Sequence, residues 1–70
     1  MLIEFTHMDY FQDAWVEKPV LLNTRHIIRV SPKKEKEYNT VIRYGYNGGS
    51  TLFIKETMEE IKQKVNLRGV

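Results

Sequence analysis

The chain contains no cysteine, only two prolines and a single tryptophan among its 70 residues. Without cysteine, neither a disulfide nor a thiolate metal site can supplement the hydrophobic core. A chain of this length is near the lower limit at which a core is stable alone. The apolar 41% of the residues must therefore suffice, or a partner surface must contribute. We expect self-association for this reason.

Long apolar runs are also missing. No stretch approaches the roughly 18 residues that a membrane-spanning helix needs. The N-terminus lacks the basic start and long apolar region of a signal peptide. These features predict a single cytoplasmic domain over residues 1–70, with no membrane span.

Signatures of enzyme or metal chemistry are absent as well. The candidate metal ligands, His7, His26, Asp9 and Asp13, share no helical i, i+4 spacing and have no thiolate companion. The serines and threonines stand in no nucleophile-elbow motif. The Asn47-Gly48-Gly49 segment is not followed by the lysine and helix of a phosphate-binding loop. We therefore predict no catalytic residue, no metal, no cofactor and no enzymatic activity.

What the chain does contain is strand-forming sequence with turn signals between the strands. Asn47-Gly48 separates two β-branched and aromatic runs, which is the strongest short-range signal for a hairpin. Asn23-Thr24 predicts a corner, because both side chains can bond nearby backbone groups. Strands are predicted over residues 1–7, 27–33, 39–46 and 50–55. A further strand is predicted within 15–22; because of Pro19 it either starts near Val20 or runs along a sheet edge.

Two local details complete the β prediction. Residues 8–14 are expected to form a loop or an irregular turn. Ile28 and Val30 are expected to share one face of their strand, opposite Arg29 and Ser31. The fold class predicted is mainly β (α+β): about five antiparallel strands in meander order, curled or barrel-like, with one C-terminal helix.

The C-terminal helix is predicted over about residues 57–67. Thr57 and Glu60 have the spacing of a capping box, in which each side chain bonds the other's backbone amide. Met58, Ile61 and Val65 follow at offsets of three and four and form one narrow apolar stripe. Lys62, Gln63 and Lys64 are expected to face water. A helix this short must pack its stripe on the sheet or on a neighbouring subunit.

Several segments also carry a resemblance to known proteins. They are Pro-Val-Leu-Leu-Asn at 19–23, Ile27-Ile28-x-Val30, Thr40-Val41-Ile42, Asn47-Gly48, Ile54-Lys55-Glu56-Thr57 and Glu59-Glu60-Ile61. In these segments the chain resembles the small flagellar swarming-motility proteins of the FlbD/SwrD type, and also short β-rich proteins of phages and mobile elements. The resemblance implies a small β protein that works in a flagellar or phage-related context.

Positive charge is concentrated in the middle of the chain, although the net charge is only +2. Arginine and tyrosine on one sheet face are typical of small barrels that hold nucleotide phosphates and stack bases. The candidate nucleic-acid or nucleotide-binding residues are Arg25, Arg29, Arg43, Lys33, Lys34, Lys36 and Tyr44. Alternating lysine and glutamate in the 33–37 segment is equally typical of a solvated turn.

A second candidate surface is aromatic and acidic. Large apolar side chains crowd the segment from Met8 to Trp15, so they either cap one end of the barrel or contact a partner. The candidate protein interface comprises Tyr10, Phe11, Trp15 and the helix stripe Met58, Ile61 and Val65.

The function predicted first is a non-enzymatic protein-interaction module that self-associates and docks on a larger assembly, flagellar or phage-related. The alternatives are a nucleic-acid or nucleotide-binding small barrel and a phage-encoded inhibitor of a host defence system. The salt dependence of binding and the oligomeric state distinguish the first two.

Overall fold

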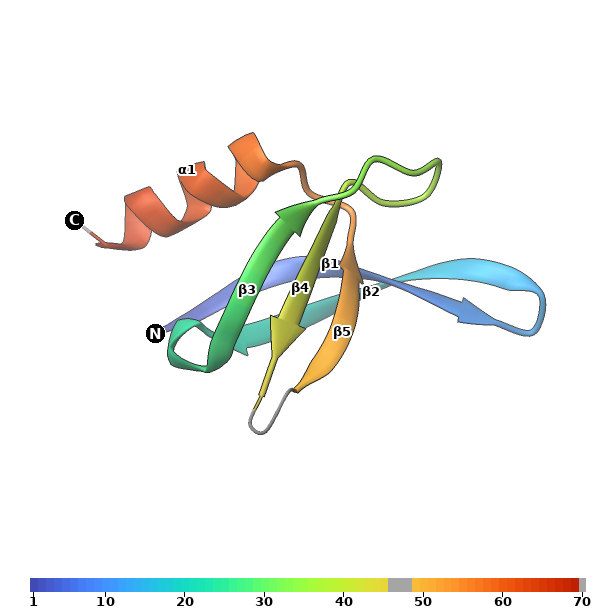
Figure 1. Ribbon diagram of the computed structural model, residues 1–70, viewed down its shortest axis with the longest axis horizontal. Helices are drawn as coiled ribbons and strands as arrows, with labels where there is room; N and C mark the ends of the chain where they lie inside the picture. The colour runs from blue at the N-terminus through green and yellow to red at the C-terminus, as the bar shows by residue number, and fades with distance from the viewer. Residues whose placement is uncertain (46–48, 70) are drawn as a thin grey trace.

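The computed structural model describes residues 1–45 and 49–69 (Figure 1). Its elements are the strands β1 (Leu2–Phe11), β2 (Ala14–Asn23), β3 (Ile27–Pro32), β4 (Thr40–Tyr44) and β5 (Ser50–Ile54), the short 3-10 helix η1 (Thr24–His26) and the helix α1 (Met58–Gly69). The prediction of five antiparallel strands and one C-terminal helix is confirmed. The turn residues Asn47 and Gly48 and the end of the predicted strand 39–46 lie outside the described residues.

The five strands form one antiparallel sheet with the order β2-β1-β5-β4-β3. Strands that follow each other in the chain are neighbours within β1–β2 and within β3–β4–β5. The predicted meander order is wrong between β2 and β3, because these two strands are not neighbours. β2 and β3 are the two free edges, and β1 pairs with β5 instead. The sheet is therefore curled and remains open between β2 and β3.

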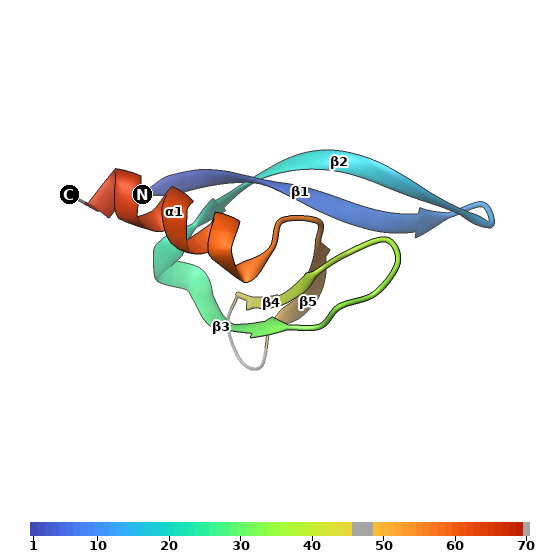
Figure 2. The same ribbon diagram turned by 90° about the horizontal axis from the view of Figure 1, so that it is seen from above.

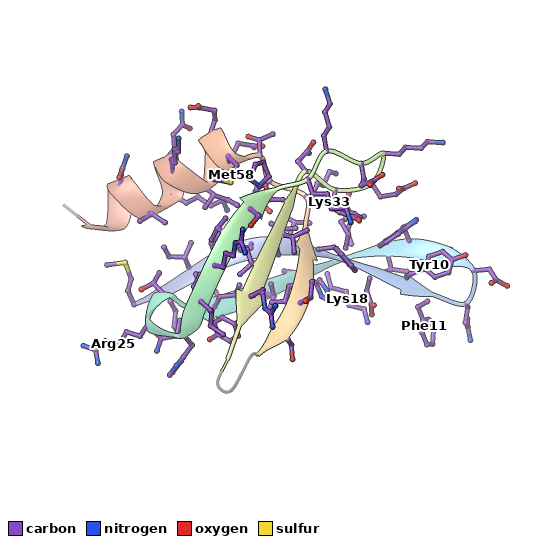
Figure 3. All side chains as sticks on the ribbon, viewed as in Figure 1. Tyr10, Phe11, Lys18, Arg25, Lys33 and Met58 are labelled. Carbon is purple, nitrogen blue, oxygen red and sulfur yellow. The ribbon has the colours of Figure 1, made fainter. Side chains whose placement is uncertain are left out.

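β1 and β2 form a hairpin that is paired over its whole length, from Leu2↔Asn23 to Phe11↔Ala14. The predicted loop or irregular turn over 8–14 is wrong for most of these residues, because only Gln12 and Asp13 form a turn and the others belong to β1 and β2. Both turn residues have positive φ, 51° at Gln12 and 62° at Asp13, as in a type I′ turn. Neither is asparagine or glycine, so the usual sequence signal for this turn is missing. Figure 3 shows Tyr10 and Phe11 on opposite sides of the projecting hairpin end.

The two prolines of the chain lie on the two edge strands, Pro19 in β2 and Pro32 in β3. The backbone oxygen of Thr6, the residue that pairs with Pro19, accepts from Lys55 at 2.9 Å, and its amide bonds Glu56 at 2.8 Å. Both groups of Thr6 thus point away from β2, so Pro19 needs no amide hydrogen there. The nitrogen of Pro19 faces the free edge, where it interrupts the row of donors that another strand would need.

β3 contains an irregularity between Ile27 and Arg29, where the register with β4 shifts. The shift leaves Ile27 and Val30 packed against the core and Ile28 half-exposed at 51%. The prediction that Ile28 and Val30 share one face of the strand is therefore wrong, because an irregularity in strand pairing resets the alternation of side chains along a strand.

The core lies between two layers of the curled sheet and the helix. Figure 2 shows the hairpin β1–β2 above the strands β3, β4 and β5, with α1 along one side. The buried core residues come from all three parts: Ile3, Phe5 and Leu22 from the hairpin, Ile42 and Ile54 from the three strands, and Ile61 from the helix. The helix stripe thus packs on the chain's own sheet.

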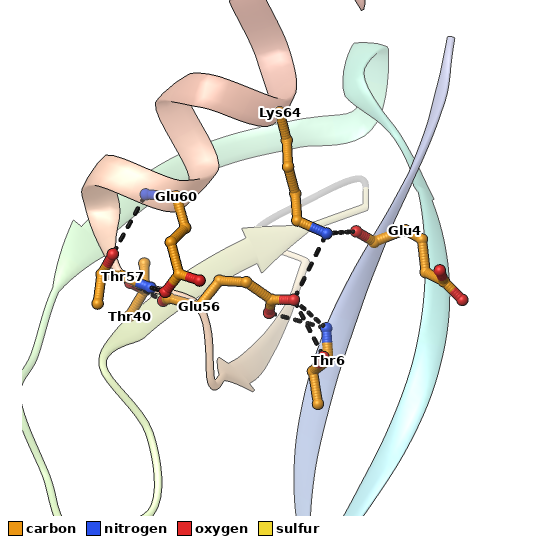
Figure 4. A network of polar contacts seen from close by, with 7 residues as sticks. All are labelled: Glu4, Thr6, Thr40, Glu56, Thr57, Glu60 and Lys64. Atoms are coloured by element: carbon orange, nitrogen blue, oxygen red, sulfur yellow. Dashed lines mark hydrogen bonds and ion pairs between the residues drawn. The ribbon is translucent and has the colours of Figure 1, made fainter. Parts of the chain in front are cut away.

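The connection from β5 to α1 is fixed by polar contacts (Figure 4). The Glu60 amide donates to Thr57 Oγ1 at 3.2 Å and the Thr57 amide donates to Glu60 Oε1 at 3.0 Å, which confirms the predicted capping box. Lys64 does not face water as predicted: its ammonium donates to the Glu4 carbonyl at 2.7 Å and lies 3.5 Å from the Glu56 carboxylate. The helix is therefore tied to β1 at its second turn, through Lys64.

Across the described residues we find no helix whose length and apolar character would allow it to cross a bilayer.

Candidate interaction surfaces

The outer end of the β1–β2 hairpin extends past the rest of the sheet. All ten residues of β1 pair with β2, but with β5 only His7 has a partner, Ile54. Beyond that point Tyr10 and Phe11 keep 58% and 57% of their surface exposed, and Val16 on the neighbouring strand keeps 37%. We call Tyr10, on one side of the ribbon, and Phe11 and Val16, on the other side, the distal hairpin surface. Exposed aromatic side chains on a projecting ribbon are typical of a protein contact site.

Trp15 does not belong to this exposed group, because its ring is half-buried in an aromatic cluster. Its centroid lies 5.7 Å from that of Tyr38 and 6.3 Å from that of Phe53, and Tyr38 and Phe53 are 4.6 Å apart. Tyr10 extends the cluster at 5.2 Å from Trp15. Tyr38 and Phe53 were not among the residues singled out from the sequence. The position of Phe53 between the core-facing Leu52 and Ile54 was the available signal, since alternation turns it to the opposite face.

Two of the predicted basic residues lie side by side on the face of the sheet that points away from the core. Arg29 of β3 is the direct cross-strand partner of Arg43 of β4, and both are exposed. Arg43 follows the buried Ile42, which places the arginine pair on the outer face. Side chains in such a pair have Cβ atoms about 5 Å apart.

The same outer face carries hydroxyl and aromatic groups. Val41 pairs with Ser31 on one side and with Phe53 on the other, and Arg43 pairs with Thr51. The outer face of β3–β4–β5 therefore presents Arg29, Ser31, Val41, Arg43, Thr51 and Phe53. These three strands contain no aspartate or glutamate, so the two arginines are their only charged residues.

Tyr44 does not join this face, and its predicted role beside the arginines is wrong. Its hydroxyl accepts a hydrogen bond from the backbone amide of Asn23 at 2.9 Å. Its ring contacts His26 edge-on, with 6.0 Å between the ring centroids. Because Tyr44 directly follows Arg43 in β4, the two side chains point to opposite faces. Tyr44 packs against the core instead.

The remaining basic candidates are exposed but spread out. Arg25 belongs to η1, before β3 begins, while Lys33, Lys34 and Lys36 follow its end. Figure 3 shows Arg25 and Lys33 at opposite ends of the strand, which at six residues is about 20 Å long. Arg25 before β3, Arg29 within it and Lys33 after it therefore form a row of cations along this edge strand.

The helix stripe is largely unavailable to a partner. Ile61 is 6% exposed within the core and Met58 is half-buried, while Val65 keeps 39% of its surface exposed. The expectation that Ile61 contributes to an interface is wrong, because the chain's own sheet covers it.

Carboxylates gather around an open depression of about 290 Å³ between β1, β2 and α1, lined in part by Glu17, Glu56 and Lys64. Two of the carboxylates that line it, those of Glu17 and Glu56, have structural partners. Glu17 pairs with Lys55, and this hydrogen bond raises the pKa of the lysine. Glu56 bonds Thr6 and Lys64. The pKa of the nearby Glu60 is lowered, first by the hydrogen bond from the Thr57 backbone amide and second by the Thr57 hydroxyl.

Metal ligands are not grouped in the described part of the chain. No cluster of three or more histidine, aspartate or glutamate side chains there could hold an ion. Of the candidates named from the sequence, Asp9 pairs with Lys18 at 3.3 Å and His26 contacts Tyr44.

Comparison with protein-family models, with curated proteins and with solved structures finds no match to this chain.

Proposed function

We propose that the protein is a non-enzymatic interaction module that self-associates and docks on a larger protein through the distal hairpin surface. The observation that carries the proposal is the exposure of Tyr10 and Phe11, 58% and 57%, at the end of a fully paired hairpin. The resemblance to small swarming-motility proteins points to a flagellar or phage-related assembly as the larger partner.

The hairpin end suits this role because it is rigid as well as exposed. Trp15 packs against Tyr38 and Phe53 on one side of the ribbon and anchors it to the sheet. Aromatic side chains held in place lose little conformational entropy on binding, and they concentrate binding energy in interfaces. The free edges of the sheet are poorer candidates, because Pro19 and Pro32 interrupt their donors.

Light scattering over a concentration series tests self-association. We expect the mass to rise with concentration for the wild type, with little dependence on salt, because the contact is apolar. A Tyr10→Ser, Phe11→Ser double variant should remain monomeric. Leu21→Ser is the matched control, since Leu21 is also an exposed apolar residue of this hairpin, at 61%, but lies near its inner end. A wild type that stays monomeric throughout, or a Leu21→Ser variant that also loses association, would contradict self-association.

Docking on a larger protein needs a separate test. A photo-crosslinking residue placed at position 11 should form a discrete adduct in cells that express the full chain. The same residue at position 21 should not form that adduct. Equal adducts at both positions, or none at position 11, would reject docking through this surface.

A further inference from the structure

We infer that the outer face of β3–β4–β5 is a binding site for the phosphate backbone of single-stranded nucleic acid, independent of the distal hairpin surface. The inference starts from the direct cross-strand pair Arg29↔Arg43. Both side chains are exposed on the outer face of the sheet, so the two guanidinium groups can contact the same anion.

The groups around the pair match a phosphodiester. Ser31 lies two residues from Arg29 on the same face, and Thr51 is the cross-strand partner of Arg43. Guanidinium forks donate two parallel hydrogen bonds to phosphate oxygens, and hydroxyl groups add further donors. The face therefore presents two planar cations and two neutral donors within one patch of three strands.

Charge continues from this patch along the β3 edge. Arg25 lies before the strand and Lys33 after it, and both side chains are exposed. A strand of six residues is about 20 Å long, which gives a chain of several phosphates successive cations to contact. A single small anion would need only the arginine pair, so the row favours an extended polyanion.

Aromatic rings adjoin the same patch and favour nucleic acid over other polyanions. Phe53 lies diagonally across from Arg43, because its partner Val41 is two residues before that arginine. The Trp15 ring is 6.3 Å from Phe53, and Trp15 keeps part of its surface exposed. Unpaired bases stack on such rings without needing a defined sequence, whereas the paired bases of a duplex are not available to do so.

Fluorescence anisotropy with a labelled 12-nucleotide oligothymidine tests the proposal. We expect binding at low salt, with log K falling against log salt by about 0.7 for each phosphate contacted. Arg29→Gln and Arg43→Gln should each weaken binding at least tenfold and reduce that slope by about 0.7. Lys62→Gln removes the same charge from an exposed position of α1 and should leave affinity within twofold.

Two further measurements decide what is recognised. Stacking should quench the single tryptophan when the oligonucleotide binds, whereas inorganic polyphosphate should not quench it. Because both arginines are exposed, the glutamine variants should melt within a few degrees of the wild type, so loss of binding cannot be attributed to unfolding. No binding at low salt, or an equal loss with Lys62→Gln, overturns the site. Competition by polyphosphate or a phosphopeptide as strong as that of the oligonucleotide, with no quenching, overturns its assignment to nucleic acid.

Discussion

The backbone amide of Thr6 in β1 donates hydrogen bonds to both carboxylate oxygens of Glu56, which lies in the connection before α1; the N–O distances are 2.8 and 3.1 Å. The Thr6 hydroxyl donates to the same group at 3.0 Å, and the Lys64 ammonium is 3.5 Å away. The β1 strand has no sheet partner for this amide, so the side chain replaces one. A residue fifty positions later in the chain thus completes the hydrogen bonding of the first strand.

Replacing Glu56 tests the strength of this contact. The Glu56→Ala variant leaves a part-buried amide without an acceptor and should lose about 2 kcal/mol of stability, roughly 10 °C in Tm. Glu56→Gln keeps one carbonyl acceptor and should lose about half as much. Glu59→Ala, at an exposed position of the first helical turn, is the control and should change Tm little. Thermal unfolding that ranks Glu59→Ala with Glu56→Ala would contradict this account of the connection.

The capping box of α1 predicts both a stability change and a pH dependence. Thr57→Ala removes the acceptor for the Glu60 amide and should cost about 1 kcal/mol. The folded-state pKa of Glu60 is lowered, so its stabilising effect is complete above the ordinary carboxyl pKa and is lost as pH falls through the lowered value. Acidification should therefore destabilise the wild type more than Glu60→Gln. Identical pH profiles for the two proteins, measured by urea unfolding, would show that the box is not formed.

Positive φ angles predict opposite effects at two turns. Gly49 has φ of +62°, and a Cβ there would lie 2.5 Å from the Tyr44 carbonyl oxygen, so Gly49→Ala should destabilise the fold by at least 1–2 kcal/mol, to order of magnitude. Asp13 also has φ of +62° but carries a side chain. Asp13→Gly should therefore stabilise the hairpin, by about 0.5–1 kcal/mol. Denaturant titration should shift the two midpoints in opposite directions; a shift in the same direction would reject the turn geometry.

Trp15 and Phe11 are expected to respond differently to truncation, although both are aromatic residues of one hairpin. Trp15 contacts three other rings, so Trp15→Ala should cost about 2 kcal/mol or more. Phe11 is 57% exposed, and Phe11→Ala should change the stability of the monomer by less than about 0.5 kcal/mol. Urea unfolding at low protein concentration separates the two effects. A large loss for Phe11→Ala there would mean that this ring serves the fold rather than a partner.

The features that the sequence predicted well depend on residues close together in the chain. Thr57 and Glu60 form their capping box within one turn, and the Asn23 side chain accepts from the Arg25 amide at the predicted corner, at 3.0 Å. These contacts need only local backbone geometry, so residue type and spacing are enough to indicate them.

The missed features depend on long-range pairing or on an unusual turn. The pairing of β1 with β5 joins His7 to Ile54, and no local pattern encodes that contact. The turn at Gln12 and Asp13 contains neither asparagine nor glycine, so the usual sequence signal for a two-residue hairpin turn is missing there. On the outer face, two of the basic residues singled out from the sequence, Arg29 and Arg43, are direct cross-strand partners. Their aromatic neighbour is Phe53 rather than Tyr44, because alternation along β4 turns Tyr44 to the core.

Amide chemical shifts recorded over a dilution series test the central claim, that the distal hairpin surface is where this protein associates. We expect concentration-dependent shifts at residues 9–17 and unchanged shifts along β3, β4 and the exposed face of α1. Shifts confined to the helix or to the strand edges, or none at any concentration up to the millimolar range, would contradict it.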